Sequence, residues 1–306
     1  MAQPPAARTP PLEIERLDGR STRELLAFCT AHPAADLDPA VVRALLTHLA
    51  PSPAHVLDLA IAGQRVMVAS VVDTVDNADR SALVALLGCS DDPARAAAAL
   101  APALTLAEDL VRTGNRSLVD VPLPVRLARH APVLFARGYR PAYREQLMAR
   151  PARRPEDQAP VAAGDRWTDG HAGDAEALHA LAHAAFAGAP GWQGTDVDAA
   201  RTQLRDASIP PRLLWRGGLL AGYVRVSVDD GIGTIHVIAR RPEQRGRGVG
   251  RLLLLEAVRQ LHVRGARELR LEVAAANRAA IALYQAHGFA VTGEQVTYRR
   301  EIDRDQ

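Results

Sequence analysis

The sequence predicts a mixed α/β fold (α/β with α+β character) arranged as two tandem domains. Three observations lead to this prediction. Strand-like and helix-like segments follow one another in the same order in both halves of the chain. Glycines that turn or end these segments recur at nearly constant offsets. A proline-rich stretch, residues 150–164, separates the halves, and 306 residues are enough for two buried cores.

The second half contains the clearest periodic segments. Its expected order is a helix over 175–187, a hairpin over 213–228, a strand over 232–239, a helix over 249–263, a strand over 268–274, a helix over 277–287 and a closing strand. Gly217 and Gly218 supply the hairpin turn, because a tight hairpin needs positive φ angles there. Gly265 is placed to end the helix over 249–263.

The first half repeats this order. A hairpin over 56–72, a strand over 81–88, an alanine-rich helix, a strand over 117–123 and a further helix follow one another. The paired glycines lie 154, 151 and 150 positions apart: Gly63 and Gly217, Gly114 and Gly265, Gly138 and Gly288. A duplicated domain explains these offsets. We therefore expect a disordered N-terminus at 1–10, a first domain at 11–149, a linker at 150–164 and a second domain at 165–302.

Charge and composition argue against several classes of protein. The 37 basic and 35 acidic residues give a net charge of +2, which does not support a nucleic-acid or membrane partner. No lysine occurs, so the chain offers neither a Schiff-base lysine nor the lysine of a G-x-x-x-x-G-K-[ST] phosphate loop. Cys29 and Cys89 are far apart and form no C-x-x-C pair, so we expect neither a disulfide framework nor a zinc site. The N-terminus lacks an apolar signal core, so we expect a cytoplasmic protein.

Residues 243–255, EQRGRGVGRLLLL, place three alternating glycines directly before an apolar helical run. The first amides of a helix have no partners within it, and the helix dipole adds partial positive charge there. Glycines let such amides approach an anion, so this stretch predicts a phosphate or diphosphate site, with added charge from Arg245, Arg247 and Arg251. A glycine turn with solvated arginines is the alternative. The G-x-G-x-G spacing does not fit the dinucleotide-binding pattern G-x-G-x-x-G.

Two motifs together resemble the signatures of the GNAT superfamily of N-acetyltransferases. RPEQRGRGVGRLLL is similar to the superfamily's acetyl-CoA motif, Q/R-x-x-G-x-G/A, through Gly246, Gly248 and Gly250. NRAAIALYQAHGF, residues 277–289, is similar to its second signature, an asparagine followed by L-Y-x-x-x-G-F. The resemblance covers residues 165–302. It implies a mixed, splayed sheet flanked by helices, with acetyl-CoA as co-substrate.

The resemblance also implies which residues contact the co-substrate. Backbone amides at the helix start would hold the CoA diphosphate, and the end of the preceding strand would run beside the pantetheine arm. Tyr284 would lie near the thioester sulfur. The implied binding positions are Ile238, Ala239, Arg240, Arg245, Gly246, Arg247, Gly248, Val249, Gly250 and Asn277. Arg240 departs from the family pattern, which usually has an apolar residue there.

Acetyl transfer to an amine needs a neutral amine and a proton for the departing thiolate. A tyrosine, with a pKa of ~10, can protonate a thiolate, with a pKa of ~8.5, without being ionised at neutral pH. We therefore expect Tyr284 to act as the general acid; a buried aromatic of helix packing is the alternative. Thr234 stands where the family often has a glutamate. His236, two residues on, is the candidate base, and a structural strand histidine is the alternative.

His179 and His183 lie four positions apart on one predicted helix, a spacing that could bind a metal. No third ligand accompanies them, so no metal is predicted. In the GNAT fold this first helical region borders the acceptor site. These histidines, with Trp192, Asp196 and Asp198, are therefore candidates for shaping or attracting a cationic amine, with solvated surface as the alternative.

The first half lacks the same features. The offset of 151 places Arg95, Ala97 and Ala99 at the positions of the three glycines, and Leu134 or Phe135 stands at that of the tyrosine. Each added Cβ would crowd a diphosphate. We therefore expect the first domain to have kept its fold, lost its cofactor site and taken a structural role. The tandem layout resembles that of mycothiol synthases.

Together these patterns predict an N-acetyltransferase that transfers an acetyl group from acetyl-CoA to a primary amine by direct attack, in the C-terminal domain and without a metal. A small molecule or a peptide is the expected acceptor, with no nucleic-acid or membrane partner. An internal duplication is compatible with a monomer. The alternative is a non-catalytic acyl-CoA-binding or sensing module, and a GNAT protein that transfers another acyl group is a third reading.

Overall fold

The computed structural model of the chain describes residues 117–152, 164–190, 196–206 and 209–302, together with Trp192, Gly194 and several positions between 100 and 112. Between residues 12 and 89 it describes the backbone of four strands. Some predictions concern positions outside the described residues: the N-terminal segment 1–10, Cys29, the turn at Gly63, residues 94–99, Gly114 and most of the expected linker.

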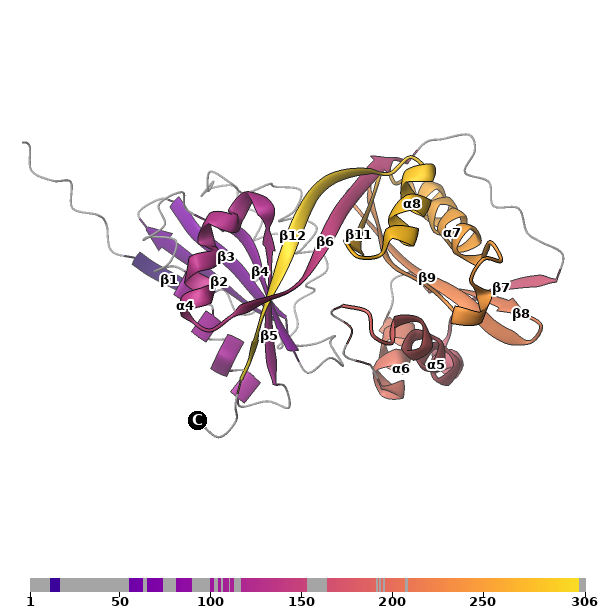
Figure 1. The fold of residues 1–306 in the computed structure, drawn as a ribbon, viewed down its shortest axis with the longest axis horizontal. Helices are drawn as coiled ribbons and strands as arrows, with labels where there is room; N and C mark the ends of the chain where they lie inside the picture. The colour runs from indigo at the N-terminus through magenta and orange to yellow at the C-terminus, as the bar shows by residue number, and fades with distance from the viewer. Residues whose placement is uncertain are drawn as a thin grey trace, which may run out of the picture. The chain divides into compact units, whose positions relative to one another are not determined.

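The described chain forms two compact units (Figure 1). The first contains the N-terminal strands, the residues up to Pro141 and the residues from Tyr298 onward. The second contains Ala142–Thr297. Strands β6, Arg140–Pro151, and β12, Ala290–Glu301, contribute residues to both units.

A mixed sheet forms the centre of the second unit. Its strands are ordered β12-β6-β11-β10-β9-β8-β7. Strands β10 and β11 are parallel, whereas β11 with β6, β10 with β9, β9 with β8 and β8 with β7 are antiparallel. The strands not yet bounded are β7 Asp165–Asp169, β8 Arg212–Arg216, β9 Leu219–Asp229, β10 Ile232–Arg240 and β11 Glu268–Ala274. The predicted mixed sheet is confirmed.

Two pairs of helices cover opposite faces of this sheet (Figure 1). Their bounds are α5 Ala175–Phe186, α6 Val197–Asp206, α7 Val249–Val263 and α8 Arg278–Ala286. Buried residues of α7 and α8 share one core cluster with Ile235 of β10, and buried residues of α5 and α6 share another with Ala239 of the same strand. The register shift in β10 between Ile235 and Val237 interrupts the alternation of side chains, so these two residues, four positions apart, face opposite cores and the sheet separates them.

The local signals of the second half are confirmed. Gly217 and Gly218 have φ angles of 57° and 81° between β8 and β9, as a tight hairpin requires. Helix α7 has the bounds predicted from its apolar spacing. Gly265, with φ 80°, follows its end, and its amide bonds to the His262 carbonyl at 3.0 Å.

Strand β6 belongs largely to the second unit, although it precedes the expected linker. It pairs with β11 from Glu145 opposite Ala274 to Pro151 opposite Glu268. The Ala152 amide bonds to the Arg267 carbonyl at 2.9 Å and extends this attachment. Pairing with β11 therefore carries the strand into the first residues of the 150–164 segment, because a strand in register satisfies its backbone groups.

The first unit repeats the predicted order of elements. Its strands are ordered β1-β2-β3-β4-β5, followed by β12. Their bounds are β1 Leu12–Arg16, β2 His55–Ala62, β3 Arg65–Asp73, β4 Ser81–Cys89 and β5 Leu118–Pro124. A 3₁₀ helix, Val125–His130, and helix α4, Ala131–Ala136, follow β5, and Gly138 with φ 87° ends this helical segment.

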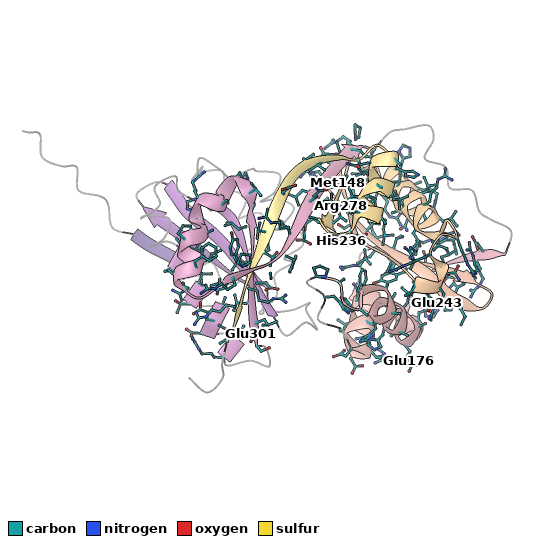
Figure 2. The ribbon with its side chains drawn as sticks, in the orientation of Figure 1. Met148, Glu176, His236, Glu243, Arg278 and Glu301 are labelled. Atoms are coloured by element: carbon teal, nitrogen blue, oxygen red, sulfur yellow. The ribbon has the colours of Figure 1, made fainter. Side chains whose placement is uncertain are left out.

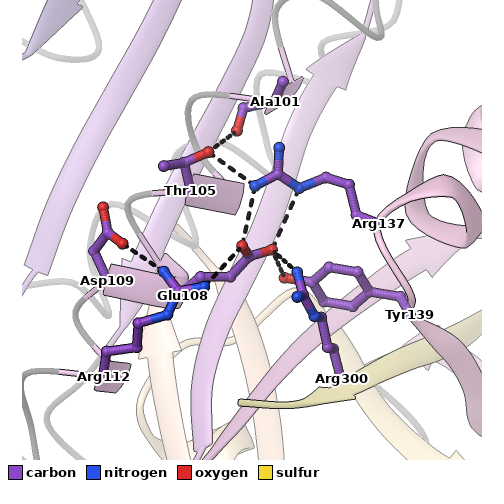
Figure 3. A network of polar contacts seen from close by, with 8 residues as sticks. All are labelled: Ala101, Thr105, Glu108, Asp109, Arg112, Arg137, Tyr139 and Arg300. Atoms are coloured by element: carbon purple, nitrogen blue, oxygen red, sulfur yellow. Dashed lines mark hydrogen bonds and ion pairs between the residues drawn. The ribbon is translucent and has the colours of Figure 1, made fainter. Parts of the chain in front are cut away.

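A buried carboxylate organises polar contacts inside the first unit (Figure 3). Glu108 is 3% exposed, and its carboxylate accepts hydrogen bonds from Arg137 Nη2 at 3.0 Å and the Tyr139 hydroxyl at 3.2 Å. Arg300 Nη1 forms an ion pair with it at 2.9 Å. Burial, with the nearby carboxylate, raises the pKa of Tyr139 well above its ordinary value. The opposite charges compensate one another, as a buried ionic cluster requires.

Candidate active site

The parallel strands β10 and β11 separate part of the way along their length. They pair from Ile232 opposite Glu268 to Ile235 opposite Leu271, and the pairing ends there. Both strands continue, β10 against β9 as far as Arg240 and β11 against β6 as far as Ala274. The facing edges beyond the last pair therefore have backbone groups available to an extended ligand. The splayed sheet expected from the sequence is present.

The glycine stretch forms a left-handed turn directly before helix α7. Gly246 and Gly248 have φ angles of 71° and 75°, and Gly248 is the N-cap residue. No heavy atom lies within 4 Å of the position that a Cβ would take at either glycine. Glycine is therefore required there by backbone conformation, and its small size leaves the first amides of α7 open to a ligand. The surrounding Arg245 and Arg247 are exposed.

A short 3₁₀ helix, Pro242–Gln244, joins the end of β10 to this turn. Ile238 packs partly against the core under α7, and Ala239 is buried in the core under α5 and α6. A Cβ at Gly250, the second residue of α7, would lie 3.5 Å from Leu283 Cδ2 and 3.8 Å from Arg240 Nε. The strand end, the helix start and helix α8 thus meet at Gly250. The predicted binding positions from Ile238 to Gly250 form one continuous segment of strand, turn and helix.

Asn277 is the N-cap residue of α8. Its Oδ1 accepts a hydrogen bond from the Ala280 amide at 3.2 Å. This capping interaction stabilises the start of the helix that carries Tyr284. The side-chain amide nitrogen is not used by the cap, and Asn277 is exposed, so a donor remains for a ligand.

Tyr284 lies in the last turn of α8 and belongs to the core cluster under α7. Its side chain is 8% exposed, and its ring centroid lies 6.0 Å from that of Phe289. Burial raises the pKa of Tyr284 to about 12. The phenol therefore holds its proton throughout the physiological range, which a proton donor requires.

His236 is the first residue of β10 after the last pair with β11 (Figure 2). An irregularity in the β9–β10 register lies between Ile235 and Val237, at this histidine. Its Nε2 lies 2.8 Å from Ser227 Oγ on β9. This contact fixes the ring at the point where the strands separate, and the hydroxyl can donate to a neutral imidazole or accept from a protonated one.

Glu272 occupies the equivalent position on β11, directly after Leu271 of the last pair. Leu271 and Val273 are buried in the core under α7, so the alternation of the strand directs Glu272 to the opposite face. Gln295 Nε2 on β12 donates to Glu272 Oε2 at 3.1 Å and to Glu145 Oε2 on β6 at 2.8 Å. One side-chain amide thus joins two carboxylates on this face.

The surroundings of Glu272 change its acidity. The residue is exposed to solvent where the strands separate, and the protein atoms around its carboxylate raise its pKa to about 7. The Glu145 carboxylate raises it further, whereas the hydrogen bond from Gln295 lowers it. A carboxyl group that titrates near neutral pH is suited to proton transfer. Sequence reasoning missed this residue, because its Glu145 and Gln295 partners come from strands far away in the chain.

The other predicted acceptor-side residues make local contacts. His179 and His183 have ring centroids 6.1 Å apart on α5. The Trp192 ring packs against Phe186 at 5.1 Å. Asp196 Oδ1 accepts from the Ala199 amide at 2.6 Å at the start of α6. Each of these contacts has a structural explanation, and recognition of a cationic amine by these residues stays a prediction.

Asp198 forms an ion pair with Arg201 one helical turn along α6. Among the residues that the structure describes, no group of three or more histidine, cysteine, aspartate or glutamate side chains is arranged to hold a metal ion. None of the described helices is long and apolar enough to cross a bilayer.

The segment that contains the strand separation, the glycine turn and α8 matches a known family. Residues 176–289 match the model of the acetyltransferase (GNAT) family. The match includes β10, α7, β11 and α8. The second unit therefore carries a GNAT acetyltransferase domain.

Curated relatives extend this similarity. The chain is 34% identical over 137 residues to mycothiol acetyltransferase from Thermobispora bispora, covering 42% of this chain and 46% of the relative. It is 33% identical over 125 residues to mycothiol acetyltransferase from Catenulispora acidiphila, covering 38% of this chain and 40% of the relative. The chain thus spans less than half the length of these relatives.

Solved structures show the same fold along nearly the whole chain. A GCN5-related N-acetyltransferase from Sphaerobacter thermophilus has a TM-score of 0.69 at 20% identity and covers 96% of this chain and 97% of its own. A tandem GNAT protein from the clavulanic acid biosynthesis pathway has a TM-score of 0.62 at 19% identity and covers 96% and 99%. Both likenesses support the predicted tandem GNAT architecture.

Proposed function

We propose that the chain is an acetyl-CoA-dependent N-acetyltransferase whose active site lies in the second unit and whose acceptor is a primary amine. One observation carries this proposal: β10 separates from β11 after Ile235, and the chain beyond the end of β10 forms a left-handed glycine turn that opens α7. An extended thioester could follow the open strand edges while its diphosphate contacts the helix amides. Residues with acid–base chemistry lie at the same separation.

Glu272 is our candidate for the proton acceptor. With a pKa of about 7, its carboxylate is ionised in a substantial fraction of molecules at neutral pH and can take a proton from the acceptor ammonium, directly or through water. The neutral amine then attacks the thioester carbonyl, forming a carbon–nitrogen bond. His236, predicted from the sequence for this role, remains the second candidate, held by Ser227 at the same level of the sheet.

The remaining proton transfer falls to Tyr284. Collapse of the tetrahedral intermediate breaks the carbon–sulfur bond and releases a thiolate, which takes the phenolic proton. A tyrosine pKa of about 12 keeps the donor protonated before the step. The tyrosinate formed is the stronger base, so it recovers a proton rapidly from water or from the acetylated product. Unpaired amides on the β10 edge would provide donors to the carbonyl oxygen as negative charge develops on it.

The acceptor is expected to be a small molecule. The matching curated relatives are named mycothiol acetyltransferases, which favours a small acceptor over a protein. Glu272 and Glu145 lie on the face of the sheet covered by α5 and α6 and would favour a cationic amine there. Peptide N-termini belong in the same test panel.

Two measurements test the proposed function. Calorimetric titration with CoA measures binding, and release of free thiol from acetyl-CoA with a panel of small amines and peptides measures transfer. We expect micromolar CoA binding and amine-dependent thiol release. Tyr284→Phe should reduce kcat about 10- to 100-fold with unchanged CoA binding, and an unchanged turnover number would remove the acid role. CoA binding without turnover on any amine would favour the non-catalytic binding module.

A further inference from the structure

Arg240 is a cation at the end of β10, and among the residues that the structure describes no acidic side chain pairs with it. Its side chain is partly buried, and no hydrogen bond or ion pair joins it to another residue that the structure describes. The next residue, Arg241, donates from Nε to the Leu220 carbonyl at 2.8 Å. Arg216 nearby in the unit is paired with Asp165 at 2.8 Å. Arg240 differs from both because its guanidinium is available to bind a ligand.

The surroundings of Arg240 destabilise its positively charged form. Burial lowers its pKa, and the positive charge of Arg245 lowers it further. Its Nε would lie 3.8 Å from a Cβ at Gly250, so the guanidinium stands over the second residue of α7, beside the unpaired amides of the helix start. A partly desolvated cation beside these amide donors, with another cation near, is stabilised by an anion bound at that point.

We propose that the Arg240 side chain binds the diphosphate of the acyl-CoA from the strand side, while the α7 amides bind it from the helix side. The inference rests on the proposed function and extends it. The family resemblance assigns this position a backbone contact with the pantetheine arm, and its usual apolar side chain could not contact a phosphate. In this chain the same position makes recognition depend on the phosphate groups of the thioester carrier.

The contact should make the effect of an Arg240 substitution depend on whether the thioester carries a diphosphate. Thioesters without a diphosphate, such as S-acetyl-pantetheine, cannot use Arg240 and should not distinguish the native chain from a variant without it. A thioester with the diphosphate should distinguish them strongly. This separates a contact with phosphate from a general effect on the shape of the site.

The decisive experiment compares Arg240→Leu with Arg264→Leu. Arg264 lies at the opposite end of α7, is exposed and donates to the Gln260 carbonyl at 3.0 Å, so its variant removes the same charge away from the site. We expect Arg240→Leu to weaken CoA binding in calorimetry about 10- to 100-fold, as loss of a charge-assisted contact predicts. The KM for acetyl-CoA should rise equally, with the KM for S-acetyl-pantetheine unchanged. Arg264→Leu should change neither.

Further variants keep the inference open to contradiction. Arg240→Lys retains the charge without the planar fork and should give an intermediate loss of CoA affinity. Without ligand, Arg240→Leu should melt no lower than the native chain, because an uncompensated charge is removed. If it fails to fold, Arg240→Gln takes its place. Equal losses with both thioesters, or unchanged CoA affinity, would overturn the inference. A native chain that does not bind CoA would instead contradict the proposed function itself.

Discussion

In the first unit, β4 and β5 pair in parallel over Ser81–Leu83 and Leu118–Asp120, and the pairing then ends. In the second unit, β10 and β11 do the same over Ile232–Ile235 and Glu268–Leu271. Both units therefore separate a parallel pair of strands at the same stage of the fold. The difference lies in the side chains that follow.

The residue after the last pair on β5 is Val121, which is fully buried, whereas the equivalent residue on β11 is Glu272. Leu134, also fully buried, stands at the tyrosine's place in the first unit. Carboxylates of the first unit are bound by arginines instead: Asp120 receives two hydrogen bonds from Arg299 at 2.7 and 2.6 Å. The fold is thus shared, while among the residues compared the second unit has at this position a carboxylate whose partner is the Gln295 amide.

The largest expected effect comes from giving the second unit the glycine-turn residues of the first. The double variant Gly246→Arg, Gly248→Ala copies Arg95 and Ala97 from the equivalent positions. Both glycines have positive φ angles, so the added Cβ atoms strain the turn and fill the approach to the helix amides. We expect CoA binding to weaken about 100-fold or more in calorimetric titration.

Gly218→Ala is the matched control for this variant. Gly218 also has a positive φ angle, 81°, and open space around its Cβ position, but it lies in the β8–β9 turn. It should carry a similar conformational cost, about 1 kcal/mol, without loss of CoA affinity. CoA binding by the double variant within threefold of the native value would contradict the assignment of the turn.

The next effect concerns Glu272. Glu272→Val copies Val121 of the first unit, and Glu272→Gln keeps the shape and the contact with Gln295. Both should lower kcat/KM about 10²- to 10⁴-fold, as loss of a general base does, with CoA affinity unchanged. Because the base acts when deprotonated, native kcat/KM should fall as the pH drops below about 7. This limb should be lost in Glu272→Gln.

His236→Gln provides the comparison on the neighbouring strand. If Glu272 is the base, this variant keeps the acid limb and most of its activity. A pH profile that loses its acid limb in His236→Gln and keeps it in Glu272→Gln would transfer the role to the histidine.

A stability measurement tests the other side of the comparison. Glu108→Gln removes the buried charge that compensates Arg137 and Arg300 in the first unit. Breaking such a cluster should reduce the free energy of unfolding by about 2–3 kcal/mol, a discounted value because both arginines keep some contact with water. Urea unfolding measures this loss. CoA affinity should stay unchanged, and a large loss of affinity would show that the first unit contributes to the site.

Much of the fold could be predicted from local signals. The α7 bounds followed from apolar spacing and Gly265, and the β8–β9 turn from Gly217 and Gly218, because such signals depend on neighbouring residues alone. The attachment of β6 to β11 did not follow, because strand pairing between residues more than a hundred positions apart leaves no local pattern. The linker expected to begin at residue 150 was inferred from proline content alone.

The candidate site divides in the same way. The glycine turn and Tyr284 could be found as motifs, since their residues are close together in sequence. Glu272 could not, because its acidity depends on Glu145 and Gln295, which reach it from β6 and β12. The signal available was its place on β11, one residue beyond Leu271, which becomes meaningful once the end of the pairing with β10 is known.

The smallest expected effect is the stability cost of keeping Glu272 where it is. Its pKa is about 7 in the folded chain and near 4.5 when unfolded, so the folded state binds more protons between these values. The free energy of unfolding should therefore fall as the pH rises from about 4.5 to 7 and stay lower above it. Glu272→Gln removes this titration and should stabilise the chain at pH 8 by about 1 kcal/mol, a value discounted for solvent contact, but not at pH 4.

Thermal unfolding at both pH values measures the difference. The control is Glu294→Gln, which changes an exposed carboxylate contacted by Gln146. Equal melting shifts for the two variants would mean that the pKa of Glu272 is not raised in the folded chain. The assignment of Glu272 as a base that titrates near neutral pH would then lose its physical support.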